Sequence, residues 1–213
     1  MTENPRTPQE TQDLFNQWAA TYDQDLQTGA NLGPLTGYAH SLDVASALLP
    51  ITARQSVLDI GIGTGAFAER LEKRGATITG IDPSAKMLEK CHEIHPDYRL
   101  KIGSFTDIPF EDGQFDAIVA SFAFHEVAVD QRETVCQKLM NLLKPNGYVC
   151  MVDIIFASIA ARENAKAHIG KYWDDTEDYP LVHDLDAYLY GSQFQHVLWQ
   201  QTTLCHWVML ARK

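Results

Sequence analysis

The sequence lacks the marks of a nucleic-acid-binding or membrane-spanning protein. Its 213 residues include 17 Lys and Arg against 28 Asp and Glu, a formal net charge of -11, and the basic residues never cluster beyond adjacent pairs. Because nucleic-acid binding draws mainly on basic side chains, no nucleic-acid partner is expected. The polar start, residues 1–10, has neither the apolar stretch of a signal peptide nor a membrane span, so a cytoplasmic location without membrane contact is expected.

Paired cysteines are also absent. The four cysteines lie far apart in sequence and form no Cys-x-x-Cys pair, which argues for free thiols in a reducing compartment. Only the run Cys91-His92-x-x-His95 invites a metal interpretation. Two ligands on one helix face do not close a site, so no metal ion is expected there.

The chain length fits a single domain with a substantial core. We expect one domain over residues 1–213, with three parts. Residues 1–50 form a helical lid or flank, 51–155 a cofactor-binding core, and 156–213 an acceptor-side segment that ends in a hairpin.

The organising stretch is Val57 to Gly65, where a short apolar run leads into glycines at alternate positions. A helix-period stretch to Arg74 follows, so the order is strand, tight loop, helix. Glycines allow positive φ and close approach of a ligand, and the helix N-terminus favours a polar or anionic group. The stretch therefore predicts a cofactor loop.

Strands alternating with helices predict a doubly wound α/β fold, Rossmann-like, with a mainly parallel sheet of seven strands. Only Thr202 and Thr203 separate the last two expected strands, so the final strand is antiparallel. The motif Asp130-x-x-Glu133 predicts a capping box ahead of a helix. The expected strands are 57–60, 76–81, 98–102, 115–121, 148–155, 196–201 and 204–211; the expected flanking helices are 11–27, 35–50, 157–171 and 184–190.

The glycine loop alone leaves two cofactors open. Gly61-x-Gly63-x-x-Ala66 satisfies a relaxed dinucleotide fingerprint, and Asp82 follows Gly61 by 21 residues, near the spacing of a ribose-binding acid. Asp59, however, puts a carboxylate at the strand end, where it suits an ammonium group and repels a pyrophosphate. The third glycine, Gly65, and the terminal hairpin also favour a cofactor other than a dinucleotide.

On these motifs the chain resembles the class I S-adenosylmethionine-dependent methyltransferases, over roughly Leu14 to the C-terminus. Its opening helix, with Trp18-Ala19-Ala20-x-Tyr22-Asp23, and the segment 121–125 are similar to a group of small uncharacterised bacterial members. The core motifs that carry the resemblance are 57–65, 80–84 with Met87-Leu88, 103–110, Phe115-Asp116 and 143–147.

The resemblance implies S-adenosylmethionine as the cofactor and assigns it residues along the lid helix, the glycine loop and the strand ends. Asp59 would orient the amino end, Asp82 would accept from both ribose hydroxyls, and Tyr22 would close over the methionine end. The implied cofactor-binding residues are Tyr22, Asp59, Gly61, Gly63, Gly65, Asp82, Pro83, Met87, Ser104, Phe105 and Ser121.

The sequence departs from the family pattern at the position expected to contact the adenine amino group. Relatives often carry Asp there, and this chain has Ser104. The Ser104 hydroxyl, the Phe105 backbone and Asp107 all stay open as its partner. Structural alternatives also stand beside the cofactor roles. Asp82 can serve turn chemistry next to Pro83, and Tyr22 at helical spacing can be a core residue.

Methyl transfer needs alignment and a dry cavity, and a base only when the acceptor arrives protonated. His125, at the outlet of the fourth strand beside Glu126, is the candidate catalytic base; a structural histidine is the alternative. Asp153, near the end of the fifth strand, is a second candidate. The acidic aromatic segment 172–179 predicts either an acceptor lid or a solvated loop.

The first hypothesis is therefore an S-adenosylmethionine-dependent methyltransferase acting on an unidentified small molecule. This agrees with the acidic charge and with the lack of an Asn-Pro-Pro-Tyr-like tetrapeptide after the fourth strand. A nicotinamide-dependent oxidoreductase and a non-catalytic cofactor-binding or regulatory module are the alternatives.

Overall fold

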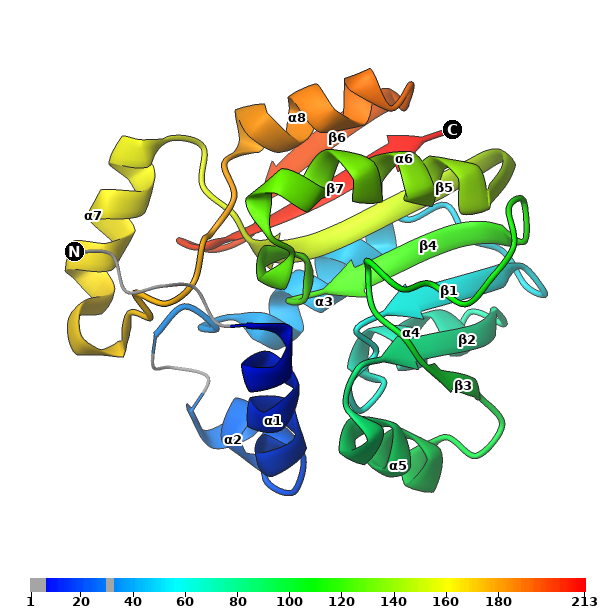
Figure 1. Ribbon diagram of the computed structural model, residues 1–213, viewed down its shortest axis with the longest axis horizontal. Coiled ribbons are helices and arrows are strands. Elements are labelled where there is room, and N and C mark those ends of the chain that lie inside the picture. Colours follow the sequence, from blue (N-terminus) through cyan, green and yellow to red (C-terminus); the bar gives the residue numbers. More distant parts are fainter. Residues whose placement is uncertain (1–6, 30–32) are drawn as a thin grey trace.

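The protein is built around one seven-stranded sheet, shown in Figure 1. The computed structural model describes residues 7–29 and 33–213. The strand order is β3-β2-β1-β4-β5-β7-β6, and only β7 runs against its neighbours, so the predicted doubly wound fold with a terminal hairpin is confirmed. The strands are β1 (Ser56–Ile60), β2 (Thr77–Asp82), β3 (Arg99–Ile102), β4 (Phe115–Ser121), β5 (Leu143–Ile154), β6 (Gln195–Gln201) and β7 (His206–Arg212).

Helices cover both faces of the sheet, because the central strands bury side chains on both sides. In β1, Val57 joins one core and Leu58 the other, as the two-residue period of a strand requires. The first core packs against α3, α4 and α5, and the second against α6 and α8. These helices are α3 (Tyr38–Leu48), α4 (Ala66–Glu72), α5 (Ala85–Ile94), α6 (Arg132–Leu142) and α8 (Val182–Gly191).

The N-terminal segment differs from the single helix predicted over 11–27. It forms two helices, α1 (Pro8–Trp18) and α2 (Tyr22–Gly29). Between them the Trp18 indole N–H and the Thr21 hydroxyl both donate to the carboxylate of Asp25 at 2.7 Å. These side-chain bonds favour a turn at the junction, which the apolar spacing of the sequence does not reveal.

Three local predictions were wrong. The expected capping box at Asp130 is absent, since Gln131 stands at the N-cap of α6 without a side-chain bond and a 3-10 turn, η2 (Val129–Gln131), precedes it. Strand β5 begins at Leu143 and takes in the predicted turn at 144–147. The β6–β7 turn spans 202–205, because the Thr203 hydroxyl accepts the N–H groups of Cys205 and His206.

The C-terminal third adds α7 (Ile159–Ile169), the 3-10 turn η3 (Gly170–Tyr172) and the loop that leads to α8. Another 3-10 turn, η1 (Phe124–Glu126), follows β4. In the segments the structure describes, no helix is long and apolar enough to cross a membrane. The carboxyl ends of β1, β2, β4 and β5 share one edge of the sheet, which is where ligands of such folds bind.

Candidate functional site

The glycine loop joins β1 to α4 and takes backbone conformations that only glycine adopts without strain. Gly61, Gly63 and Gly65 have φ angles of 72°, 54° and 96°. A Cβ on Gly61 would lie 2.6 Å from the Ala123 Cβ, whereas one on Gly63 would meet nothing within 4 Å. Gly63 therefore presents bare backbone to open space, as a cofactor cradle needs.

Gly65 has an additional packing reason. A Cβ there would lie 2.9 Å from the ring of His95 and 3.3 Å from the sulfur of Cys91. The His95 ring in turn stacks on Tyr98 with centroids 4.4 Å apart. The Cys91-His92-x-x-His95 run thus packs beneath the loop.

Asp82, at the end of β2, reaches across to the glycine loop. One carboxylate oxygen accepts the Gly63 N–H at 2.9 Å and the other accepts the Ser84 N–H at 2.8 Å. Burial raises the pKa of Asp82 to about 6, while the two backbone donors oppose that rise. Each oxygen keeps a second lone pair, so the carboxylate can still accept from two hydroxyl groups.

Asp59, at the end of β1, is the least satisfied polar side chain near this loop. It is fully buried, and neither carboxylate oxygen has a hydrogen-bond partner within the described segments. Burial, and then the charge of Asp82, raises its pKa to about 8. A buried carboxylate without partners costs free energy unless a cation joins it.

Helices α1 and α2 close over these strand ends. Thr64 donates to Asp23 at 2.7 Å, the Gln12 amide donates to the Pro83 carbonyl at 2.6 Å, and the Ser84 hydroxyl bonds to Asn16 at 2.7 Å. Helix α2 therefore contacts the loop after β1, and helix α1 contacts the turn after β2. Sequence reasoning missed Asp23 and Asn16, because their partners lie 41 and 68 residues away.

Tyr22 lies where this lid meets the cofactor loop. The residue is half-buried, and Tyr38 is its neighbour at the start of α3. Burial raises the pKa of Tyr22 well above its usual value, and the neighbouring Tyr38 adds to that rise. The phenol therefore stays protonated, beside the carboxylates of Asp82 and Asp23 that also disfavour its ionisation.

The adenine side of the predicted site contains both buried and exposed groups. Met87 is buried at the start of α5, where Ser84 caps its N–H, and Phe105 packs edge-on against Phe124 at 5.2 Å. The Ser104 hydroxyl bonds within its own turn, to Thr106 and to the Asp107 N–H. Half-buried Pro83 and Ser121 stand at the ends of β2 and β4.

At the outlet of β4, His125 is held by Asp153 from β5. The ring Nδ1 lies 2.5 Å from Asp153 Oδ1, and Asp153 Oδ2 accepts the backbone N–H groups of Phe124 and His125. If the ring is neutral with its proton on Nδ1, toward this carboxylate, the lone pair lies on Nε2. The two candidates of the sequence thus form one unit, with Asp153 positioning His125.

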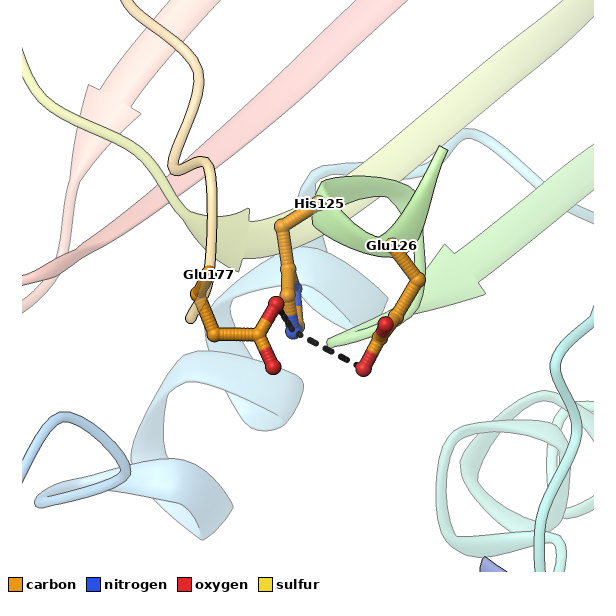
Figure 2. A group of neighbouring side chains, drawn as sticks. All are labelled: His125, Glu126 and Glu177. Atoms are coloured by element: carbon orange, nitrogen blue, oxygen red, sulfur yellow. Dashed lines mark ion pairs between the residues drawn. The ribbon is translucent and has the colours of Figure 1, made fainter. Parts of the chain in front are cut away.

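Two glutamates face the other ring nitrogen. Glu126 Oε1 and Glu177 Oε2 each lie 3.9 Å from His125 Nε2. Figure 2 marks both ion pairs with dashed lines. Glu177 belongs to the acidic segment 172–179, which therefore reaches the strand ends. Segment 172–179 is aromatic as well as acidic, with Trp173 and Tyr179 in edge contact at 5.0 Å.

Arg132 joins the η1 turn to the acidic segment 172–179 through hydrogen bonds. The sequence analysis did not identify this residue. Its guanidinium, in a residue only 4% exposed, donates to the carbonyls of Val127 at 3.0 Å, His125 at 3.3 Å and Asp178 at 2.6 Å. The sequence offers one sign of a buried role for this residue, which is the position of an arginine at the start of the apolar helix stretch 132–143. The partners are backbone carbonyls, and sequence patterns do not identify those.

Comparisons with known proteins agree on one class. The profile of the methyltransferase domain family matches residues 57–147. A Staphylococcus carnosus protein named as an uncharacterized methyltransferase is 33% identical over 181 residues, which cover 85% of this chain and 84% of that protein. A Geobacillus thermodenitrificans protein with the same description is 30% identical and covers 94% of this chain and 96% of its own.

Solved structures share the fold. A SAM-dependent methyltransferase from Thermotoga maritima superposes with a TM-score of 0.73 at 18% identity, over 94% of this chain and 98% of that one. The cyclase SpnF superposes with a TM-score of 0.76 at 15% identity, over 100% and 98%. These likenesses concern the fold alone.

The chain is a class I S-adenosylmethionine-dependent methyltransferase. Within that class it belongs to the methyltransferase family of its Staphylococcus and Geobacillus relatives. The predicted enzyme class and cofactor are thereby confirmed, and the comparisons favour neither the oxidoreductase nor the non-catalytic module. The residues present fit the cofactor, because the unpartnered Asp59 carboxylate suits its ammonium group and Gly63 leaves the loop open.

Proposed function

We propose that the protein methylates a small molecule that binds at the outlet of β4, beside His125. The observation that carries this proposal is the His125–Asp153 pair at the sheet edge that also holds the glycine loop. The net charge of -11 supports a small-molecule acceptor rather than a nucleic acid.

The cofactor would be held by the residues that the sequence singled out. Asp82 would accept from the ribose hydroxyls, Asp59 would pair with the amino group, and the backbone of Gly61 and Gly63 would line the methionine part. Tyr22 would cover the methionine end from the lid. The remaining proposed contacts are Gly65, Pro83, Met87, Ser104, Phe105 and Ser121.

S-adenosylmethionine supplies an activated methyl group on a sulfonium, which becomes a neutral thioether after transfer. The chain therefore has to align the acceptor, exclude water and remove a proton. His125 Nε2 is the proposed proton acceptor, since Asp153 holds the opposite nitrogen and would stabilise the imidazolium. The lid contacts from α1 and α2 would keep water out.

Calorimetric titration with S-adenosylhomocysteine tests the cofactor assignment. Micromolar binding is expected for the native chain, and Asp82→Ala should weaken it at least tenfold because the ribose loses its charged acceptor. Asp97→Ala, a change at an exposed aspartate, is the matched control and should bind as the native chain does. Binding of NADH instead, detected by enhanced fluorescence, would contradict the proposal.

A methylation assay tests which class of compound is the methyl acceptor. A panel of hydroxyl, amine and thiol compounds is incubated with S-adenosylmethionine, and S-adenosylhomocysteine release is measured. We expect at least one class to react with the native chain and to lose its turnover in His125→Gln. Cofactor binding without turnover across the whole panel would contradict a methylating role.

A further inference from the structure

The acceptor end of the site holds a cluster of three side chains of which the proposed function uses only His125. In the part of the chain that the structure describes, His125, Glu126 and Glu177 each offer one ligand atom, and these atoms lie within 4.8 Å of one another. Figure 2 shows the two carboxylates turned toward the same edge of the imidazole ring. The three side chains are only 9%, 17% and 8% exposed, which separates them from an ordinary acidic surface cluster.

The surrounding contacts orient two of these ligands. Asp153 holds His125 Nδ1 at 2.5 Å and so directs Nε2 toward the glutamates. A carboxylate on the far nitrogen is the usual outer partner of a metal-bound histidine, where it fixes the tautomer and raises ligand basicity. Thr11 donates to Glu126 Oε2 at 3.1 Å, which leaves Oε1 as the oxygen that faces Nε2.

The loops that carry the ligands are joined independently of any ligand. Arg132 donates to the His125 carbonyl and to the Asp178 carbonyl, next to Glu177 in sequence. One buried guanidinium thus links the η1 turn to segment 172–179. The ligand set is held together by backbone contacts and does not depend on flexible surface side chains meeting.

We propose that His125, Glu126 and Glu177 form a binding site for one divalent transition-metal ion, with Asp153 as the outer partner of the histidine. One imidazole nitrogen and two carboxylate oxygens suit ions such as Zn²⁺ or Mn²⁺ and leave a position open for an acceptor oxygen. Ligand atoms around a tetrahedral ion lie about 3.4 Å apart, because each sits about 2.1 Å from it. The two glutamate oxygens lie 3.9 Å from Nε2, and all three ligand atoms lie within 4.8 Å of one another, so rotation of the side chains would bring them to this spacing.

This inference deepens the proposed function and rests on it for its chemical consequence. A bound ion would occupy the Nε2 lone pair, so in the loaded protein the imidazole would not take the acceptor proton. An acceptor hydroxyl that coordinates the ion would have a lowered pKa and would lose its proton to solvent water before the methyl transfer. The acceptor is then a compound with an ionisable hydroxyl group that coordinates the ion. Metal binding itself is independent of that consequence and is measured without turnover.

The test measures metal binding to the full chain after treatment with a chelator. Calorimetry with Zn²⁺ and Mn²⁺ should show one site, and Glu177→Gln and Glu126→Gln should each weaken it at least tenfold. Asp153→Asn should weaken it about 10–100-fold through the histidine. His183→Gln removes an exposed histidine that lies 3.0 Å from Asp184 and is the matched control, with unchanged affinity expected.

X-ray absorption on the zinc-loaded native chain supplies a readout that needs no variant to fold. One imidazole with oxygen ligands supports the site, whereas sulfur ligation would place the ion at a cysteine and overturn it. Absence of binding, full affinity in folded Glu177→Gln, or loss of affinity in His183→Gln would also overturn it. S-adenosylhomocysteine binding in the presence of chelator separates the two proposals, because it persists if only the metal site fails.

Discussion

Asp23 in helix α2 accepts a hydrogen bond from Thr64 in the glycine loop, with 2.7 Å between the two oxygen atoms. The bond joins helix α2 to the loop that is proposed to bind the cofactor. Asp23→Ala should therefore speed the dissociation of S-adenosylhomocysteine about 3–10-fold, the worth of one hydrogen bond. Stopped-flow displacement measures this rate.

Thr64→Val removes the same bond from the loop side and should give a similar rate, with no further change in the double variant. Asp13→Ala serves as the control, since the exposed Asp13 side chain bonds only to nearby Gln9 among the contacts described. Additive effects of Asp23→Ala and Thr64→Val would refute the coupling.

Asp59 should make cofactor binding depend on pH. Its pKa is about 8 because burial and Asp82 disfavour the charged form, and pairing with an ammonium group favours that form. Affinity for S-adenosylhomocysteine should therefore rise as pH increases from 6 to 8, by up to tenfold per unit, with a proton released on binding. Calorimetry in buffers of different ionisation enthalpy measures both quantities.

The same carboxylate should lower the stability of the ligand-free protein. A folded-state pKa above the unfolded value means that the folded state binds more protons, so stability falls as pH rises from about 4 to about 8. Asp59→Asn should raise the melting temperature at pH 8 and abolish the pH dependence of binding. A pH profile unchanged in this variant would remove Asp59 from the cofactor site.

His125→Gln should lower kcat about 100-fold or more, the usual contribution of a general base, while S-adenosylhomocysteine affinity stays within about twofold. Asp153→Asn should also lower kcat, because the amide can no longer hold the Nδ1 proton as a carboxylate does. Steady-state kinetics on a reactive acceptor measure this, with His183→Gln as control. Native turnover in His125→Gln would show that the histidine is structural.

Arg132→Met should lower the free energy of unfolding by about 3 kcal/mol, because three carbonyl groups lose a buried charged donor. Urea unfolding measures the loss. Arg162→Met, at a partly exposed pair with Glu163, is the matched control and should change stability by less than about 0.5 kcal/mol. Equal losses in the two variants would contradict the linking role of Arg132.

The core of the fold was predictable because its signals are local. Strand β4 has the predicted bounds, Phe115 to Ser121, and Asp59 and Asp82 follow neighbouring strands whose carboxyl ends must meet. The errors arose where side chains bond to the backbone or to one another over a few residues. The turn before α2 and the β6–β7 turn depend on such bonds at Asp25 and Thr203, which hydrophobic periodicity does not report.

The residue sequence therefore specified the layered sheet, the glycine loop and the carboxylates at its strand ends, since spacing along a chain sets strand and helix periods. It named His125 and Asp153 separately but could not pair them across 28 residues. The tertiary structure alone decided that pairing, the approach of Glu177 and the role of Arg132. Contacts between distant segments depend on how the loops pack, and no local pattern records that.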